Sequence, residues 1–212
     1  SAHGGGEPVM VRQIDLSNDP RRAQFDYFRN FRDPYVSVTV PVDITRLRER
    51  GTPLFLSYLW CAIRAANAVP ELRRRIDGER VVEYDRCLSS HTVALPNGSY
   101  CYCTLDCEKP FDEFLPYAQA ETERAKRAAL LTGGADAAQL FFVTALPWLR
   151  FSSLSLPVPE PPDSNVRISF GGITEQNGRS LLPVNLTAHH ALADGIHLSR
   201  FFAAMQERIA EF

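Results

Sequence analysis

The chain has 212 residues, of which 45% are hydrophobic and 23% charged, and its formal net charge is −2. These values are ordinary for a globular domain, and without a long Lys/Arg run they exclude the electrostatic footprint of nucleic-acid binding. No apolar run approaches the roughly 20 residues that a membrane span requires, so we expect neither a nucleic acid nor a membrane as partner.

The length allows one large domain. The first residues, "SAHGGGEP", are not followed by the apolar segment of a signal peptide. We therefore expect residues 1–10 to be a flexible leader or tag remnant and residues 11–212 to form a single domain.

Periodicity and turn residues predict helices, a strand and a hairpin in the first half of the chain. The first helix would place Phe25, Phe28 and Phe31 on its apolar side, with Pro20 at its first position after Asp19. The expected elements are a helix at 20–31, a strand at 35–42, a helix opened by Asp43 and Thr45 and ended by Gly51, a buried helix at 54–69 ended by Pro70, and a hairpin at 73–85 turning at Asp77-Gly78.

The second half of the chain mixes strands and helices in the same way. The expected elements are strands within 90–106 split at Pro96-Asn97-Gly98, a helix at 110–132 that stops at Gly133-Gly134, a central strand and irregular segment within 139–156, a hairpin at 165–190 turning at Asn177-Gly178, and a helix at 195–211. Because the hairpins imply antiparallel pairing, we expect an α+β fold with a mixed β-sheet flanked by helices.

Five cysteines, an odd number, argue against a disulfide framework and favour a reducing, cytoplasmic compartment. Cys101, Cys103 and Cys107 form a C-x-C-x₃-C cluster, which could bind zinc with His91 as a fourth ligand. Zinc sites usually use C-x₂₋₄-C pairs instead. In a strand, Cys101 and Cys103 would share one face as buried thiols. We expect no metal.

The segment "TAHHALADGIHL" at 187–198 carries the strongest chemical signal. His189 and His190 close a predicted strand, so only one of them can face a given site. An imidazole there suits a general base, although both histidines could also be packing residues. Asp194 could orient the histidine, cap the following helix or pair with an arginine.

Together with other segments, this motif resembles the chloramphenicol acetyltransferase family within the CoA-dependent acyltransferases that share HHxxxDG. The resemblance runs from about Ile14 to Phe212. The segments that carry it, in family order, are "PRRAQFDYFR" at 20–29, "VDIT" at 42–45, "AANAVPELRRRI" at 65–76, "ALPWLRFSSL" at 145–154, "LLPVNL" at 181–186 and "HHALADGIH" at 189–197.

The resemblance implies the CoA-dependent acyltransferase fold and direct O-acetyl transfer from acetyl-CoA, the cosubstrate, to a hydroxyl of chloramphenicol, as in antibiotic resistance. By the same resemblance His190 is the general base, and Ser153 donates a hydrogen bond to the oxyanion. Ser169 matches a threonine near that site. Asp194 pairs with Arg21, a contact whose loss would cost about 3–5 kcal/mol if it is buried.

The resemblance also implies a homotrimer with active sites between subunits and an acceptor pocket that includes Tyr27, Phe28 and Tyr100. His189 and His197 would be packing residues. Two alternatives stay open: the same chemistry on another hydroxyl, amine or thiol, and a non-catalytic small-molecule binding module. The positions that depart from the family pattern are Pro34, Tyr35 and Val36 in the acceptor pocket, and Pro53, Gly172 and Ile173 on the coenzyme side.

Overall fold

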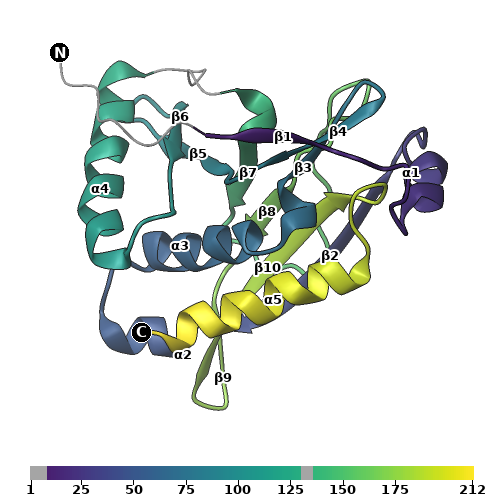
Figure 1. The fold of residues 1–212 in the computed structure, drawn as a ribbon. Helices are drawn as coiled ribbons and strands as arrows, with labels where there is room; N and C mark the ends of the chain where they lie inside the picture. The colour runs from purple at the N-terminus through teal and green to yellow at the C-terminus, as the bar shows by residue number, and fades with distance from the viewer. Residues whose placement is uncertain (1–8, 130–135) are drawn as a thin grey trace.

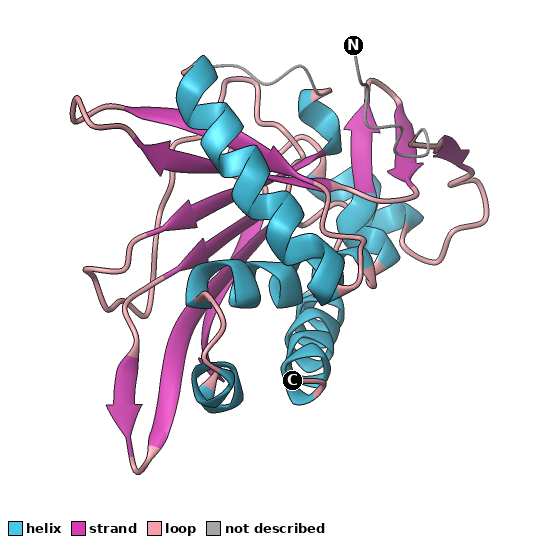
Figure 2. Ribbon diagram, turned by 90° about the vertical axis from the view of Figure 1, so that its left-hand side faces the viewer, coloured by secondary structure: helices cyan, strands magenta, loops and turns pink. Residues whose placement is uncertain are grey.

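A larger and a smaller β-sheet organise the computed structural model, which describes residues 9–129 and 136–212. Three helices, α3 (Leu54–Asn67), α4 (Phe111–Ala128) and α5 (Gly195–Ala210), cover one face of the larger sheet (Figures 1 and 2). The larger sheet has the order β2 (Tyr35–Asp43), β10 (Arg179–His189), β8 (Arg167–Phe170), β7 (Leu140–Ala145), β5 (Leu88–Ala94) and β6 (Tyr100–Leu105), with β9 (Thr174–Gln176) paired to β10. A mixed sheet flanked by helices confirms the predicted fold class.

The three central strands of this sheet, β5, β7 and β8, are parallel, and the other pairs are antiparallel. The hairpins had indicated antiparallel pairs within a mixed sheet, without indicating which strands would be parallel. Parallel neighbours need a crossover connection. Helix α4 lies in the connection from β6 to β7, whereas residues 146–166, without a helix or strand, connect β7 to β8.

A smaller sheet, β1 (Val11–Ile14), β4 (Arg80–Tyr84) and β3 (Arg74–Asp77), lies beside helix α1 (Arg22–Phe28), as Figure 1 shows. Strand β1 was not predicted. A small apolar cluster joins this sheet to α1 and to the turn after β10; its buried members are Phe25, Val81, Ala191 and Leu192.

The hairpin turns and most helix ends agree with the sequence predictions. Asn177 and Gly178 have φ of 52° and 74°, as a type I′ turn requires. Gly51 ends α2 (Thr45–Arg50) with φ of 69°. Short 3₁₀ helices, η1 (Pro70–Arg73) and η2 (Ala137–Gln139), complete the described elements.

Two helices differ from their predicted limits. Helix α1 begins at Arg22, so the placement of Pro20 at its first position was wrong: the side chain of Asp19 accepts the Arg21 N–H and its carbonyl accepts the Arg22 N–H. Helix α4 ends at Ala128, earlier than predicted. Gly133-Gly134, where its end was expected, lie outside the described residues.

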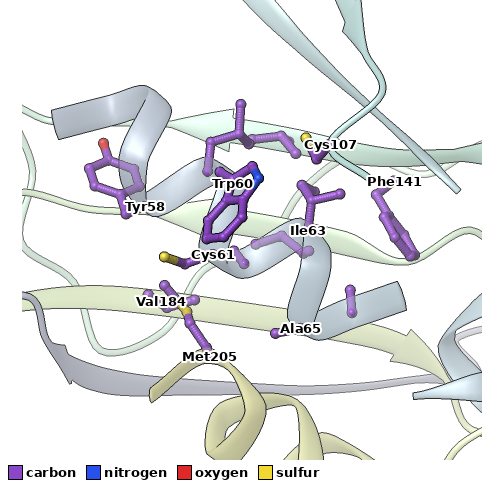
Figure 3. Close-up of a cluster of buried hydrophobic side chains, with 14 of the residues drawn as sticks. Tyr58, Trp60, Cys61, Ile63, Ala65, Cys107, Phe141, Val184 and Met205 are labelled. Carbon is purple, nitrogen blue, oxygen red and sulfur yellow. The ribbon is translucent and has the colours of Figure 1, made fainter. Parts of the chain in front are cut away.

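The main core lies between the larger sheet and the helices. Figure 3 shows residues of α3, among them Cys61 and Ile63, together with Phe141 of β7, Val184 of β10 and Met205 of α5. Burial of an aliphatic side chain of this size stabilises a fold by about 1.5–3 kcal/mol. This core therefore packs β7, β10 and α5 together against α3.

Of the expected leader, residues 1–8 lie outside the described residues. Val9 packs against the main core, and the carbonyl of Met10 accepts a hydrogen bond from the Asp85 N–H. Within the described ranges, no helix combines the length and apolarity needed to cross a membrane.

Candidate active site

His190 lies in the tight turn that connects β10 to α5. Its N–H donates to the Pro34 carbonyl, 2.8 Å away, at the point where β2 begins beside β10. The His189 carbonyl accepts the N–H groups of Leu192 and Ala193, which closes the turn. The turn residues are buried, but the His190 side chain is 32% exposed. The fold therefore holds an accessible imidazole on a rigid support.

The orientation of the His190 ring is set by three neighbours. Its Nδ1 lies 3.1 Å from the Ala193 carbonyl oxygen and 3.3 Å from Oδ1 of Asp194. Its face stacks on Phe28, with ring centroids 4.0 Å apart and planes at 7°. A carbonyl oxygen can only accept, so Nδ1 carries the proton in the neutral ring and Nε2 keeps a lone pair.

His189 makes a different set of contacts. Its side chain is buried, its Nδ1 accepts the Ala191 N–H at 3.2 Å, and its ring meets the edge of Tyr35. Burial lowers the pKa of His189 to about 4, so its imidazole is neutral. These contacts are those of a packing residue.

Arg21, which lies just before α1, binds the turn between β10 and α5 through hydrogen bonds from its guanidinium. Its Nε and Nη2 donate to the two carboxylate oxygens of Asp194 at 2.7 and 2.8 Å. Its Nη1 and Nη2 donate to the carbonyls of Ala191 and His190, both at 2.8 Å. The hydrogen bonds from Arg21 lower the pKa of the Asp194 carboxyl. Asp194 thus pairs with the arginine while remaining close to His190 and preceding α5.

Ser153 lies in the exposed segment after β7 and toward the other end of β10. This segment packs on Gly171, where a Cβ would come within 2.9 Å of the Phe151 ring. Gly171 donates its N–H to Pro183, which precedes His190 by seven residues, or about 23 Å of strand. Within the described part of one chain, no hydrogen bond joins Ser153 to His190.

The other proposed site residues fall into two groups. Phe28 touches His190 directly, and the exposed Tyr27 packs edge-to-face on Phe28. Tyr100 lies on β6, four strands or about 19 Å from β10. Ser169 is buried on β8 opposite Asn185, and within the described ranges its Oγ lacks a hydrogen-bond partner.

Contacts that the sequence analysis did not anticipate complete the site. Phe28 stacks on the imidazole itself, whereas it was expected only in the acceptor pocket. The Asp194 N–H donates to Nδ1 of His197, 2.9 Å away. The D-x-x-H spacing, in which the third helical residue reaches back to the residue before the helix, was the available signal for this second contact.

The cysteine cluster is built as a buried strand face. Cys101 and Cys103 both point inward from β6, as predicted, and His91 lies opposite Cys103 on β5. Burial raises the pKa of the Cys103 thiol to about 11. The five cysteines are free and buried, and within residues 9–129 and 136–212 no group of three or more His, Cys, Asp or Glu side chains is placed to hold a metal ion.

Comparisons with known proteins assign the chain to a family. The sequence model of the chloramphenicol acetyltransferase family matches residues 9–206. A chloramphenicol acetyltransferase of Clostridioides difficile is 30% identical over 208 residues, covering 95% of this chain and 97% of that protein. One of Clostridium perfringens is also 30% identical, over 95% and 99% of the two chains.

Solved structures extend the likeness to the fold. A chloramphenicol acetyltransferase with 30% identity superposes with a TM-score of 0.79, covering 94% of this chain and all of the other. A probable dihydrolipoamide acetyltransferase from Listeria monocytogenes, 15% identical, has a TM-score of 0.67 over 93% of each chain and shares the fold alone. The predicted CoA-dependent acyltransferase fold is confirmed, and the chain belongs to the chloramphenicol acetyltransferase family of acyltransferase enzymes.

Proposed function

We propose that this chain transfers the acetyl group of acetyl-CoA to a hydroxyl of chloramphenicol, with His190 as the general base. The observation that carries the proposal is the hydrogen bond between Nδ1 of His190 and the Ala193 carbonyl. In the neutral ring this bond places the proton on Nδ1 and leaves the lone pair of Nε2 free, and the ring is partly exposed. A base in this state can accept a proton from a bound alcohol.

In the proposed reaction, the acceptor oxygen attacks the thioester carbonyl carbon while its proton passes to Nε2 of His190. The carbonyl electron pair moves to oxygen and forms a tetrahedral oxyanion, to which Ser153 donates a hydrogen bond. Collapse re-forms the C=O bond and breaks the C–S bond, and the CoA sulfur takes the proton from His190. The products are the O-acetyl ester and CoA, and one such oxyanion donor is worth about 10²–10³ in turnover.

We propose further that each site forms between two subunits of a homotrimer. In one chain, Ser153 and Tyr100 lie away from His190, so a neighbouring subunit would supply them. Exposed large apolar side chains support an interface: Trp148 is 82% exposed, and Val38, Tyr100 and Tyr102 are exposed on strands of the larger sheet. The five free thiols accord with a cytoplasmic location.

On the proposed coenzyme side of the site, the chain packs so closely around Gly172 that it leaves no room for a side chain there. The family resemblance implies a lysine at this position. A Cβ at Gly172 would lie 2.8 Å from the Pro147 carbonyl oxygen, so that lysine would not fit without movement of the 146–151 segment. The guanidinium of Arg150 donates to the Ile173 carbonyl at 3.4 Å, so a positive charge lies beside the residue that follows Gly172. We therefore infer that this chain holds the CoA phosphates with a different set of cations from its relatives.

The test is release of CoA from acetyl-CoA, followed with a thiol reagent, in the presence of chloramphenicol. His190→Ala should lower the rate by about 10²–10⁴-fold. His189→Asn, which keeps an acceptor for the Ala191 N–H, is the matched control and should retain most of the activity.

A near-normal rate for His190→Ala would remove the general base from the proposal. If the wild-type chain is inactive with chloramphenicol but releases CoA in a screen of other hydroxyl, amine and thiol compounds, the chemistry stands with a different acceptor. Tight chloramphenicol binding without turnover of any acceptor would instead support the binding module.

A further inference from the structure

His190 and His197 each make a hydrogen bond to the same peptide group, which joins Ala193 to Asp194. The Ala193–Asp194 peptide presents its carbonyl oxygen to Nδ1 of His190 at 3.1 Å. The N–H of the same peptide donates to Nδ1 of His197 at 2.9 Å. Because a peptide group is planar, the direction of its N–H fixes the direction of its C=O.

The second nitrogen of His197 faces a carboxylate. Since the Asp194 N–H can only donate, Nδ1 of His197 is the acceptor, and the proton of the neutral ring is on Nε2. Nε2 lies 3.5 Å from Oε1 of Glu71, which belongs to η1 and is 19% exposed. Burial lowers the pKa of His197, which favours the neutral ring that this arrangement requires.

Position in the helix explains why a histidine can do this. His197 is the third residue of α5, and its own N–H donates to the Asp194 carbonyl at 3.0 Å. A third-position side chain that accepts the N–H of the residue before a helix is the reciprocal half of a capping box, usually made by Glu or Gln. The buried imidazole makes that bond here and reaches η1 as well.

We propose that His197 is a positioning residue for His190: through the Ala193–Asp194 peptide it sets the carbonyl that orients the base, with Glu71 fixing its tautomer. The proposal rests on the role proposed for His190. The role proposed for His197 differs from that of Arg21. Arg21 binds the Asp194 carboxylate and the carbonyls of His190 and Ala191 but does not contact the N–H of the Ala193–Asp194 peptide.

Two substitutions at one position separate positioning from packing. His197→Leu removes the acceptor and should lower kcat about 10–100-fold, with KM changed by less than about threefold, because a small misplacement of the base costs rate. His197→Gln keeps an acceptor at the capping-box position and should restore kcat to within about fivefold of wild type. Folding stability is measured for both, so that rates refer to folded protein.

Nitrogen-15 NMR of the imidazoles gives a readout independent of turnover. The wild-type chain should show His197 protonated on Nε2 and His190 on Nδ1; the His190 pattern should persist in His197→Gln and be lost in His197→Leu. Glu71→Ala should weaken the preference of His197 for protonation on Nε2 without unfolding the chain. A His197 tautomer unchanged in this variant would show that the Asp194 N–H alone sets it, without Glu71.

Equal kcat values for the Leu and Gln variants, or a His190 tautomer unchanged in His197→Leu, would overturn the positioning role. A wild-type chain that acetylates nothing would instead contradict the proposed function, and the NMR comparison would still decide whether His197 sets the His190 ring.

Discussion

Arg21 makes four hydrogen bonds to the turn that carries His190, which no other cation of the described chain does. The planar guanidinium allows this, since it can bind a carboxylate with two parallel N–H groups and still reach two carbonyls. The Arg21 and Asp194 side chains are 20% and 34% exposed. Solvent screening therefore makes the pair weaker than the buried pair that the sequence resemblance implied.

Arg21→Lys keeps the positive charge but removes the planar guanidinium that binds the Asp194 carboxylate with two N–H groups. We expect the free energy of unfolding to fall by about 1–3 kcal/mol, and kcat to fall at least about tenfold because the turn is less well held. Urea denaturation and the CoA-release assay measure the two effects.

The neighbouring residue supplies the control for this substitution. Arg22 is exposed and, among the described residues, forms an ion pair with Asp26 of its own helix and with no other side chain. Arg22→Lys should change stability by less than about 0.5 kcal/mol and leave kcat unaltered. Similar effects of the two Arg→Lys changes would show that Arg21 does not hold the turn.

At the scale of elements, the sequence predicted what local patterns determine. The hairpins at Asp77-Gly78 and Asn177-Gly178 and helices α2, α3 and α5 follow from turn residues, caps and periodicity. The parallel pairing of β5, β7 and β8 did not follow, because it depends on crossovers whose partners lie far apart in the chain. The short strand β1 was missed because only its pairing with β4 makes it a strand.

Strand β5 contains a buried histidine, His91, whose titration makes the stability of the fold depend on pH. His91 packs against the Phe55 ring with centroids 5.1 Å apart, and its Nδ1 has no hydrogen-bond partner within the described ranges. Burial lowers its pKa from 6.5 to about 4. As pH falls below 6.5, the unfolded chain takes up this proton before the folded chain does. Stability is therefore lost between pH 6.5 and 4.

His91→Leu should remove that part of the pH dependence. The full shift corresponds to about 3 kcal/mol, with a slope of up to about 1.4 kcal/mol per pH unit. Urea denaturation of wild type and variant at pH 7.5, 6.5, 5.5 and 4.5 measures it; His189, whose pKa is lowered in the same direction, is present in both. Parallel stability curves for the two proteins would contradict the assignment.

At the scale of the whole molecule, only some of the residues proposed for the site lie together within one chain. The fold of one chain brings His190 together with Phe28, Arg21 and Asp194. The sequence could name Ser153 and Tyr100 by resemblance, but it could not say where they lie. Their strand positions, set by sheet order and register, place them away from His190 in the same chain.

Mixed oligomers test whether the two halves come from different subunits. His190→Ala and Ser153→Ala chains are each expected to be nearly inactive as homo-oligomers. If each site takes His190 from one subunit and Ser153 from the next, random co-assembly in equal amounts leaves both residues intact in about a quarter of the sites. Co-refolding the two variants should therefore restore about a quarter of wild-type CoA release, whereas mixing them already folded should restore little. No recovery in co-refolded samples of the correct oligomeric mass would mean that both residues act within one chain, because then no mixed assembly contains an intact site.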